Sequence, residues 1–405
     1  MFNRDAFIKS YNHFDGRPLI GQTLRDFYID DFCKTSVKEI VTTVEISEQF
    51  RKMLLIGHRG CGKSTILNKV AEELRNQYYV VSFSASDELN MMDVETVDIL
   101  LAAYLQLLKS LDKNWLIKFL EKDSTIRDFI DILKKPLKLE PSVKDIELFN
   151  TIAFKFKVEN ESRAEMRSGL YGQVKELLES IDKVCQEIEK QKQKTILIII
   201  DDLDKLQTDF SEKIFFENQF LLTLPKVKVI YTFPLDTYYC DDYIRISDRY
   251  DDQFIPLVNL KNKQGQEIAF NVASLWKLID RRIDDNLVKP EAWNYLIDNS
   301  GGLLRDLVKF MQDACKLAIV EEKDVIDLAI AQQVISKYVN DYYRVFDTAK
   351  YKTAIEEIAN TKEKDGNENL IYFLRHLFAL EYRQDKQLWY DIHPCLKKAL
   401  DRDSV

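Results

Sequence analysis

Apolar runs with little alternation between apolar and polar positions predict the strands of a buried sheet. The clearest is 196–200, where five aliphatic residues follow one another. Such a strand is covered on both faces, which is typical of a parallel sheet flanked by helices. Together with this run, similar stretches predict five core strands, at 53–56, 78–83, 196–200, 227–232 and 254–258. The pattern therefore predicts an α/β fold.

Apolar residues recur at helical spacing over much of the remaining chain, which predicts amphipathic helices. We expect helices within 22–50, after residue 65, at 94–108 and 162–192, and from about residue 259 onward, including 303–320. One segment has a different pattern. Residues 146–158 alternate apolar with basic side chains, so a half-exposed strand is expected there.

A glycine-rich loop lies between the first predicted strand and a predicted helix. It fits the spacing G-x-x-x-x-G-K-[ST], with three of the chain's 11 glycines in Gly57, His58, Arg59, Gly60, Cys61, Gly62, Lys63, Ser64 and Thr65. In this strand–loop–helix context the backbone N–H groups bind phosphate, Lys63 reaches the β- and γ-phosphates, and Ser64 is a ligand of Mg²⁺. The alternative is a chance glycine turn. His58 and Cys61 are expected to be variable loop positions rather than a metal ligand or a reactive thiol.

Two carboxylates follow the aliphatic run at 196–200. Neighbouring carboxylates beside apolar residues are unfavourable unless a cation is close, and Mg²⁺ would supply it. Asp201 is the expected metal ligand, and Asp202 the residue that orients or deprotonates the attacking water. Asp204 could instead cap the next helix. The alternative is an ordinary acidic loop after a core strand.

Three further polar residues are candidates for the same site. Thr232 would lie beside the γ-phosphate if its strand neighbours 196–200. Arg305 lies in the first turn of a predicted helix, where a cation opposes the helix dipole, so an anion nearby would explain it; a local ion pair with Asp306 is the alternative. Arg249, and with less support Arg245, could reach the nucleotide of a neighbouring subunit, although a solvated surface arginine is the commoner role.

These patterns predict a domain organisation with four parts. The C-terminal part has two helices, a short hairpin and a last helix, which indicates a small winged-helix-like module in which His393 is a packing residue. A mostly helical insertion at about 88–190 would provide partner specificity or only extra packing. The parts are an N-terminal helical lead-in at 1–50, the core at 51–257, a helical lid at 258–344 and the module at 345–405.

Composition restricts the classes of function. The six cysteines are scattered without a C-x-x-C pair, which fits reduced thiols in a cytoplasm and argues against a zinc site. The first residues show no secretory signal, and the run at 196–200 is too short to span a bilayer, so no membrane partner is expected. The net charge of −9 means that nucleic-acid binding would need a local basic surface.

The motifs together resemble the AAA+/STAND group of P-loop ATPases, especially bacterial regulatory and phage-defence ATPases and, more distantly, archaeal origin-recognition ATPases. The resemblance covers about 50–320 and rests on four stretches: the glycine loop, Ile-Ile-Ile-Asp-Asp-Leu-Asp-Lys, Tyr-Thr-Phe-Pro and Gly-Gly-Leu-Leu-Arg-Asp-Leu. It implies a three-layer P-loop NTPase core with a strand between the loop strand and the Asp-Asp strand, a helical lid and often a winged helix. It also implies that Thr232 is a first sensor and Arg305 a second.

One residue departs from the AAA+ pattern. Typical members have glutamate as the catalytic base, whereas this chain has Asp202, as many STAND proteins do. A shorter carboxylate is consistent with slow hydrolysis. We therefore expect an ATP- and Mg²⁺-dependent switch, acting as a homo-oligomer or with a separate effector protein in defence or signalling. The alternatives are a DNA-binding initiator or loader that reads DNA through 345–405, and a scaffold that holds ATP without hydrolysing it.

Overall fold

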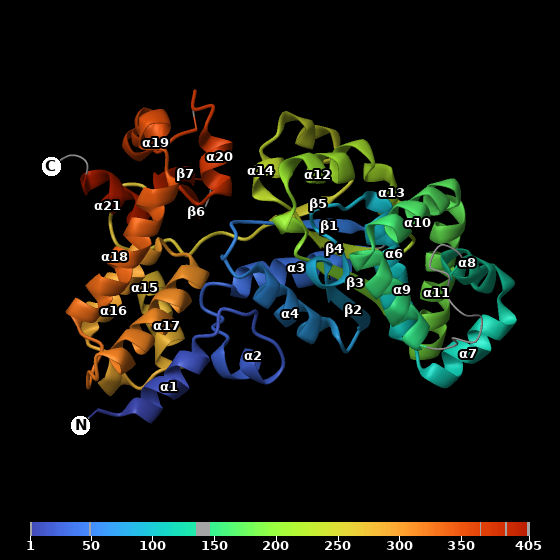
Figure 1. Ribbon diagram of the computed structural model, residues 1–405, viewed down its shortest axis with the longest axis horizontal. Coiled ribbons are helices and arrows are strands. Elements are labelled where there is room, and N and C mark those ends of the chain that lie inside the picture. The colour runs from blue at the N-terminus through green and yellow to red at the C-terminus, as the bar shows by residue number, and fades with distance from the viewer. Residues whose placement is uncertain (1, 48–49, 135–145, 365, 385–386, 403–405) are drawn as a thin grey trace. The chain divides into compact units, whose positions relative to one another are not determined.

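The computed structural model describes residues 2–47, 50–134, 146–364, 366–384 and 387–402 (Figure 1). The chain forms two compact units, each built from segments far apart in sequence. The first unit contains Met1–Lys38, Gly57–Lys69 and Phe254–Val405. The second contains Glu39–Ile56 and Val70–Gln253. Within the described residues, no helix combines the length and the apolar character that crossing a membrane requires.

The second unit is organised around a five-stranded sheet with the order β2-β3-β4-β1-β5. The pairs β2–β3, β3–β4 and β4–β1 are parallel. Strand β4 separates β1 from β3, as the resemblance to P-loop ATPases implied. The predicted parallel sheet is thus confirmed, with strands β1 (Lys52–Ile56), β2 (Tyr78–Ser84), β3 (Thr195–Asp201), β4 (Lys228–Thr232) and β5 (Asp251–Phe254).

The last strand lies earlier in the chain than the sequence pattern indicated. We expected it at 254–258, whereas β5 ends at Phe254. Pro256 has no backbone N–H to donate to a ladder, so apolar character alone did not locate the strand. The apolar residues Ile255, Leu257 and Val258 are still buried, which explains the misleading signal.

Helices fill most of the region between β2 and β3. The prediction of a strand at 146–158 was wrong, because this segment is a helix. Its buried residues Phe149, Ile152 and Phe156 recur at helical spacing, whereas Phe154, which the alternation placed with Phe156, is 65% exposed. The expected helix at 162–192 is two helices. In order these helices are α5 (Ala85–Glu88), α6 (Thr96–Lys109), α7 (Lys113–Lys122), α8 (Ser124–Lys134), α9 (Ile146–Val158), α10 (Asn160–Gly172) and α11 (Val174–Lys192).

Shorter helical segments connect β3, β4 and β5 in the same unit. They include a 3₁₀ turn directly after the Asp-Asp pair. In order they are η1 (Leu203–Lys205), α12 (Thr208–Glu212), the π-helical η2 (Lys213–Glu217), α13 (Gln219–Thr223), α14 (Leu235–Tyr238) and η3 (Asp241–Arg245).

The first unit is mainly helical, and α1 lies beside α17 in it (Figure 1). Helices α3 (Lys34–Ile46) and α4 (Lys63–Leu74) begin in this unit and continue into the other. Its remaining helices are α1 (Arg4–His13), α2 (Gln22–Phe27), α15 (Ala269–Asp280), η4 (Asp285–Leu287), α16 (Pro290–Ser300), α17 (Leu304–Val320), α18 (Leu328–Val345), α19 (Thr348–Thr361), α20 (Leu370–Arg375) and α21 (Pro394–Arg402).

A two-stranded hairpin completes this unit. Strands β6 (Ala379–Gln384) and β7 (Gln387–Ile392) pair antiparallel, as the sequence predicted. The second of the two helices expected before the hairpin is the short α20, and Leu377, two residues after its end, has a left-handed backbone with φ of 58°. Helices α19 and α20, the hairpin and α21 are the elements predicted for the C-terminal module; its winged-helix character stays a prediction.

Candidate functional site

The glycine loop is a tight bend between β1 and α4, so the predicted order of strand, loop and helix is confirmed. Gly57 has φ of 150°, and a Cβ there would lie 2.7 Å from the carbonyl oxygen of Ile255. Gly60 has φ of 95°, and a Cβ there would lie 2.9 Å from the Cβ of Arg305. Only glycine fits both positions, because neither the backbone angle nor the space accepts a side chain.

Lys63 is the first residue of α4, and its side chain turns back to the loop. The residue is 5% exposed, and its Nζ donates to the carbonyl oxygens of Gly57 at 2.7 Å and His58 at 2.9 Å. Ser64 follows in the first turn of the helix and is half-buried. The first N–H groups of a helix have no partner within it and carry the positive end of its dipole. Glycines, lysine and helix terminus thus suit a phosphate ligand.

Arg305 lies against this loop. Its backbone N–H donates to the carbonyl oxygen of Gly60 at 3.1 Å, in the first turn of α17. The neighbouring Asp306 has its Oδ2 3.2 Å from Nε2 of the fully buried His393. The carboxylate of Asp306, which could have paired with Arg305, therefore pairs with His393, the residue directly before α21. The sequence prediction that His393 is a packing residue agrees with this contact and with its stacking on Tyr342.

His58 is the loop residue whose role the sequence did not indicate. It is 1% exposed, and its Nε2 accepts the backbone N–H of Glu381 at 2.8 Å. Burial lowers the pKa of His58 to about 3, and the nearby charge of Lys63 contributes to this shift, so the ring is neutral. Of the other loop residues, Cys61 is buried and Arg59 is exposed.

The N-terminal lead-in is fixed to the helix that follows the loop. Thr65 Oγ1 accepts the backbone N–H of Leu19 at 3.1 Å, and Asn68 Nδ2 donates to the Leu19 carbonyl at 2.9 Å. Both partners lie on the first two turns of α4. The segment around residue 19 is thereby held beside the start of this helix.

In the second unit, the acidic residues lie at the carboxyl edge of the sheet. Asp201 is the last residue of β3, and carboxylate oxygens of Asp201, Asp202 and Asp204 all lie within 4.8 Å of one another. Asp202 has a left-handed backbone with φ of 69°, which an aspartate adopts more readily than most side chains. Oxygen ligands gathered in this way suit Mg²⁺.

Asp202 has two partners that sequence reasoning missed. Ser84, the last residue of β2, donates its hydroxyl to Oδ2 at 2.7 Å, and Lys205 Nζ lies 2.6 Å from Oδ1. Partial burial alone would raise the pKa of Asp202, but the hydrogen bonds from Lys205 and Ser84 outweigh it and lower the pKa below its usual value. A polar residue at the end of the strand next to β3 was the sequence signal that could have identified Ser84.

Thr232 lies at the end of β4, which is the neighbour of β3, as its candidacy required. The residue is fully buried, and its Oγ1 accepts the backbone N–H of Leu203 at 2.9 Å. Thr232 therefore fixes the turn that carries the Asp-Asp pair. The two arginine candidates of this unit lie apart from these contacts: Arg249 is exposed, and Arg245 pairs with Asp242 at 3.1 Å on the surface.

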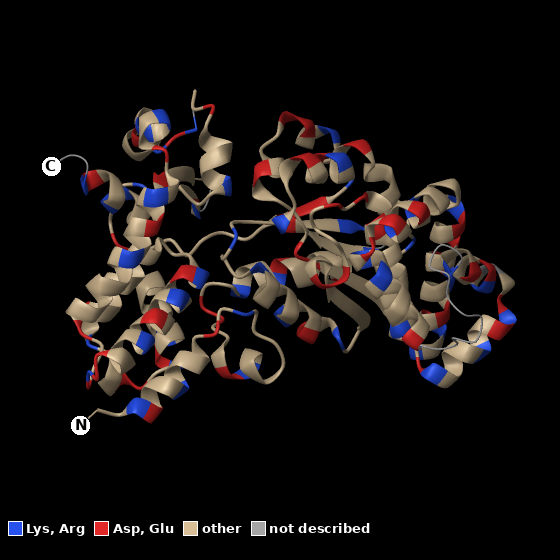
Figure 2. Cartoon of the chain, in the orientation of Figure 1, with Lys and Arg blue, Asp and Glu red and all other residues tan. Residues whose placement is uncertain are grey.

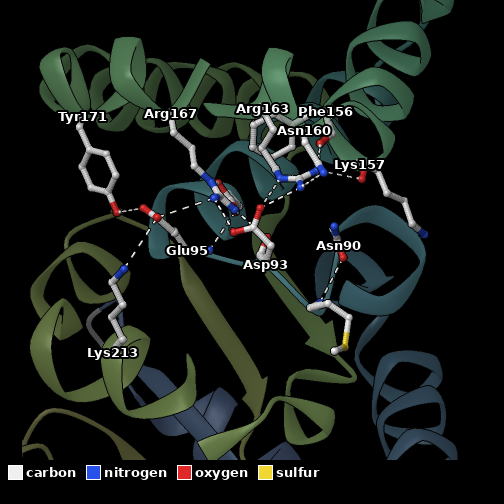
Figure 3. Close-up of polar contacts among 12 residues, drawn as sticks. Asn90, Asp93, Glu95, Phe156, Lys157, Asn160, Arg163, Arg167, Tyr171 and Lys213 are labelled. Carbon is white, nitrogen blue, oxygen red and sulfur yellow. Dashed lines mark hydrogen bonds and ion pairs between the residues drawn. The ribbon is translucent and has the colours of Figure 1, made fainter. Parts of the chain in front are cut away.

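The chain beyond Ser84 is anchored by a network of buried arginines with carboxylates, of which Asp93 is half exposed (Figure 3). Arg163, 2% exposed, donates through Nη2 to Asp93 Oδ2 at 2.8 Å. Arg167 donates through Nη1 to the other Asp93 oxygen at 2.8 Å, and its Nε bonds Asp98 Oδ1 at 2.9 Å. Helix α10 is thus tied to the loop before α6, which leads back to the strand that ends at Ser84.

The glycine loop lies in a part of the chain that matches a known protein family. Residues 34–234 match the KAP family P-loop domain. This stretch contains the glycine loop, the Asp-Asp pair and Thr232. The predicted resemblance to P-loop ATPases is thereby confirmed at the level of the P-loop domain. A search of curated proteins found no match.

A search of solved structures found matches at low sequence identity. The chain matches the Aeropyrum pernix ORC2 protein, in ADPNP and ADP complexes, at 9% identity and a TM-score of 0.45, with 97% of this chain and 96% of that chain covered. It matches the Aeropyrum pernix ORC1 protein in complex with DNA at 11% identity and a TM-score of 0.41, covering 95% and 96%. It also matches the Thermotoga maritima RuvB branch migration motor at 12% identity and a TM-score of 0.40, covering 95% and 98%.

Proposed function

From the match of residues 34–234 to the KAP family P-loop domain, we propose that this chain is a slow, Mg²⁺-dependent ATPase that works as a molecular switch. The observation that carries the proposal is the glycine loop itself. Gly57 and Gly60 leave no room for side chains, and Lys63 and the start of α4 add positive charge to the same bend. A phosphate chain is the ligand that this combination suits.

The backbone of the loop, Lys63 and Ser64 have separate roles in the proposed binding. The N–H groups of the loop and of the first turn of α4 donate to phosphate oxygens, and Lys63 exchanges its carbonyl partners for the β- and γ-phosphates. The hydroxyl of Ser64 and the carboxylate of Asp201 are the proposed ligands of Mg²⁺, which neutralises the charge that develops on the phosphates. Arg305, next to Gly60, acts as the second sensor of the γ-phosphate.

The lead-in is proposed to enclose the base. Leu19 is fixed to α4 through both its N–H and its carbonyl group, by Thr65 and Asn68. Because α4 follows the phosphate-binding loop directly, a segment fixed to its first two turns lies within reach of the rest of a nucleotide. The two contacts of Leu19 with α4 are the observations that support this role.

The proposal of slow turnover rests on Asp202. The general base must accept a proton from water, and a base with a lowered pKa is a weak one. Lys205 and Ser84 occupy both oxygens of the Asp202 carboxylate and lower its pKa. Hydrolysis then requires that these contacts rearrange, which favours a protein that stays in its ATP-bound form for long periods.

The output is proposed to belong to other protein chains, either copies of this one or a separate effector in a defence or signalling complex. The exposed Arg249 is the candidate for contact with a neighbouring subunit's nucleotide. Nucleic-acid binding by 345–405 is the second candidate function. Acidic and basic residues are interspersed on the helices of this region (Figure 2), as in α19, where Lys350 and Lys352 are followed by Glu356 and Glu357. This mixed charge favours the switch over the DNA reader.

Calorimetric titration of the full chain with ATP and Mg²⁺ tests the proposal. Lys63→Ala should lower the affinity about 100-fold, because a charge-assisted contact to phosphate is lost. Arg59→Ala is the matched control, since Arg59 is an exposed residue of the same loop. Unchanged affinity in Lys63→Ala would refute the site. Phosphate release by Asp202→Asn separates the switch from the scaffold: a scaffold shows no release in either form.

A further inference from the structure

Strand β6 contacts two parts of the proposed nucleotide site within the first unit. The N–H of Glu381 donates to His58 in the glycine loop at 2.8 Å. The hydroxyl of Tyr382 donates to the carbonyl of Gly301, in the turn before the helix of Arg305, at 2.8 Å. In the same unit, the guanidinium of the next residue, Arg383, lies 3.3 Å from the ring centroid of Phe254. Consecutive residues of one strand thus bond the glycine loop and the turn before the helix of Arg305.

The contact with His58 has a defined chemistry. Because Nε2 accepts a hydrogen bond, the proton of the neutral ring is on Nδ1. Nδ1 is buried and has no hydrogen-bond partner among the residues that the structure describes. An unsatisfied buried donor is unfavourable in a purely structural role, and such groups tend to mark functional sites. The His58 ring therefore does more than fill space behind the loop.

The backbone of His58 is hydrogen-bonded as well as its ring. Its carbonyl oxygen accepts a hydrogen bond from Lys63, the residue proposed to bind the phosphates. Phosphate oxygens compete for the same ammonium group, so ligand binding alters the contact at the carbonyl while the ring stays bonded to β6. One residue thus connects the phosphate-binding lysine with a strand residue 323 positions away along the chain.

We infer that His58 is a positioning residue that couples the glycine loop to strand β6, and that the β6–β7 hairpin is the element through which nucleotide binding is transmitted. This inference rests on the proposed function. Glu381 is fully buried and its carboxylate bonds Arg383, so the strand is held at the point where it meets the loop. Nucleotide binding orders the loop, and through His58 it orders the hairpin.

Hydrogen–deuterium exchange on the full chain tests the coupling. Saturating ADP or a non-hydrolysable ATP analogue with Mg²⁺ should slow exchange of the Glu381 amide about threefold or more in the wild type, because its bond to His58 opens less often. His58→Leu removes the acceptor, so the hairpin should exchange faster and no longer respond to nucleotide, and nucleotide affinity should fall about tenfold. His58→Gln places an oxygen near the position of Nε2 and should restore the response.

The control is His376→Leu, the same substitution at an exposed histidine of the C-terminal region. It should leave both affinity and the response of the hairpin unchanged. Hairpin exchange that is indifferent to bound nucleotide in the wild type overturns the inference, as does a His58→Leu variant that responds like the wild type. If calorimetry detects no nucleotide binding by the wild type, both the proposed function and this inference fail. If the wild type binds nucleotide but the exchange of the hairpin does not change, only this inference fails. Should His58→Leu not fold, the wild-type measurement and His58→Gln still decide the question.

Discussion

The backbone N–H of Arg305 donates to the carbonyl of Gly60 at 3.1 Å, and the Cβ of Arg305 lies 2.9 Å from the point where a side chain on Gly60 would begin. The first turn of α17 is thus packed directly on the glycine loop. This explains why a cation is retained where it opposes the helix dipole: its backbone is a structural part of the loop, and its guanidinium is kept next to the phosphate-binding bend.

Gly60→Ala should separate these two elements. Alanine meets a left-handed backbone and the Cβ of Arg305, so we expect the free energy of unfolding to fall by about 1–3 kcal/mol and ATP affinity to weaken. Gly265→Ala is the matched control, because Gly265 has φ of 81° and a Cβ added there would meet no described atom within 4 Å. Urea unfolding and calorimetry would measure both effects. Equal losses in the two variants would show that backbone strain alone matters and that the contact with Arg305 does not.

Arg305→Ala should reduce phosphate release more than nucleotide binding. If the guanidinium acts on the γ-phosphate, its removal affects the transition state for hydrolysis, and we expect release to fall at least about tenfold with little change in ADP affinity. Lys309→Ala, at an exposed position of the same helix, should have no effect. A parallel loss of ADP affinity would instead assign Arg305 to the structure of the loop.

Ser84 and Lys205 should set the pH dependence of hydrolysis. Asp202 acts as a base only when it is ionised, so the acidic limb of the rate profile follows its pKa. Lys205 and Ser84 lower that pKa, and removing either partner raises it, so the limb should move to higher pH. The shift should be larger for Lys205→Met than for Ser84→Ala. Phosphate release measured at saturating ATP across the acidic range checks this; a limb that stays in place would exclude Asp202 as the base.

The glycine loop and the sheet were predictable because their signals are local. The spacing from Gly57 to Ser64 is contiguous, and the buried run before Asp201 has a single interpretation as a strand. The position of Thr232 next to β3 was different: the residues left it as a condition, and the resemblance to P-loop ATPases implied it. The strand prediction at 146–158 was wrong because the alternation covers only a few residues. The buried residues at helical spacing extend over the whole segment.

The partners of the predicted residues could not be predicted in the same way. Ser84 and Asp202 are 118 positions apart, and His58 and Glu381 are 323 apart, so both pairs depend on how the chain packs. Glu381 contributes only its backbone N–H, which every residue except proline has, and its side-chain type therefore gives no signal. Ser84 could have been considered, because a polar residue at the end of a neighbouring strand is visible in the sequence.

The buried pair of Arg167 and Asp98 should dominate the stability of the helices between β2 and β3. The two side chains are 10% and 2% exposed. Arg167→Leu leaves a carboxylate buried without its partner, and we expect the free energy of unfolding to fall by about 3–5 kcal/mol in urea denaturation. Lys175→Leu, which breaks the exposed pair with Glu179, should cost less than about 1 kcal/mol.

The double variant Arg167→Leu/Asp98→Asn tests whether the unpaired charge is the cause. Asparagine still accepts the N–H of Glu95 that Asp98 accepts at 2.9 Å, so the start of α6 keeps its cap while the buried charge is removed. The double variant should therefore be more stable than Arg167→Leu alone. If the changes in the free energy of unfolding were simply additive, the loss would come from packing of the arginine side chain rather than from the unpaired carboxylate of Asp98. Because this network leads back to Ser84, phosphate release by the double variant would also show whether the helices between β2 and β3 influence Asp202.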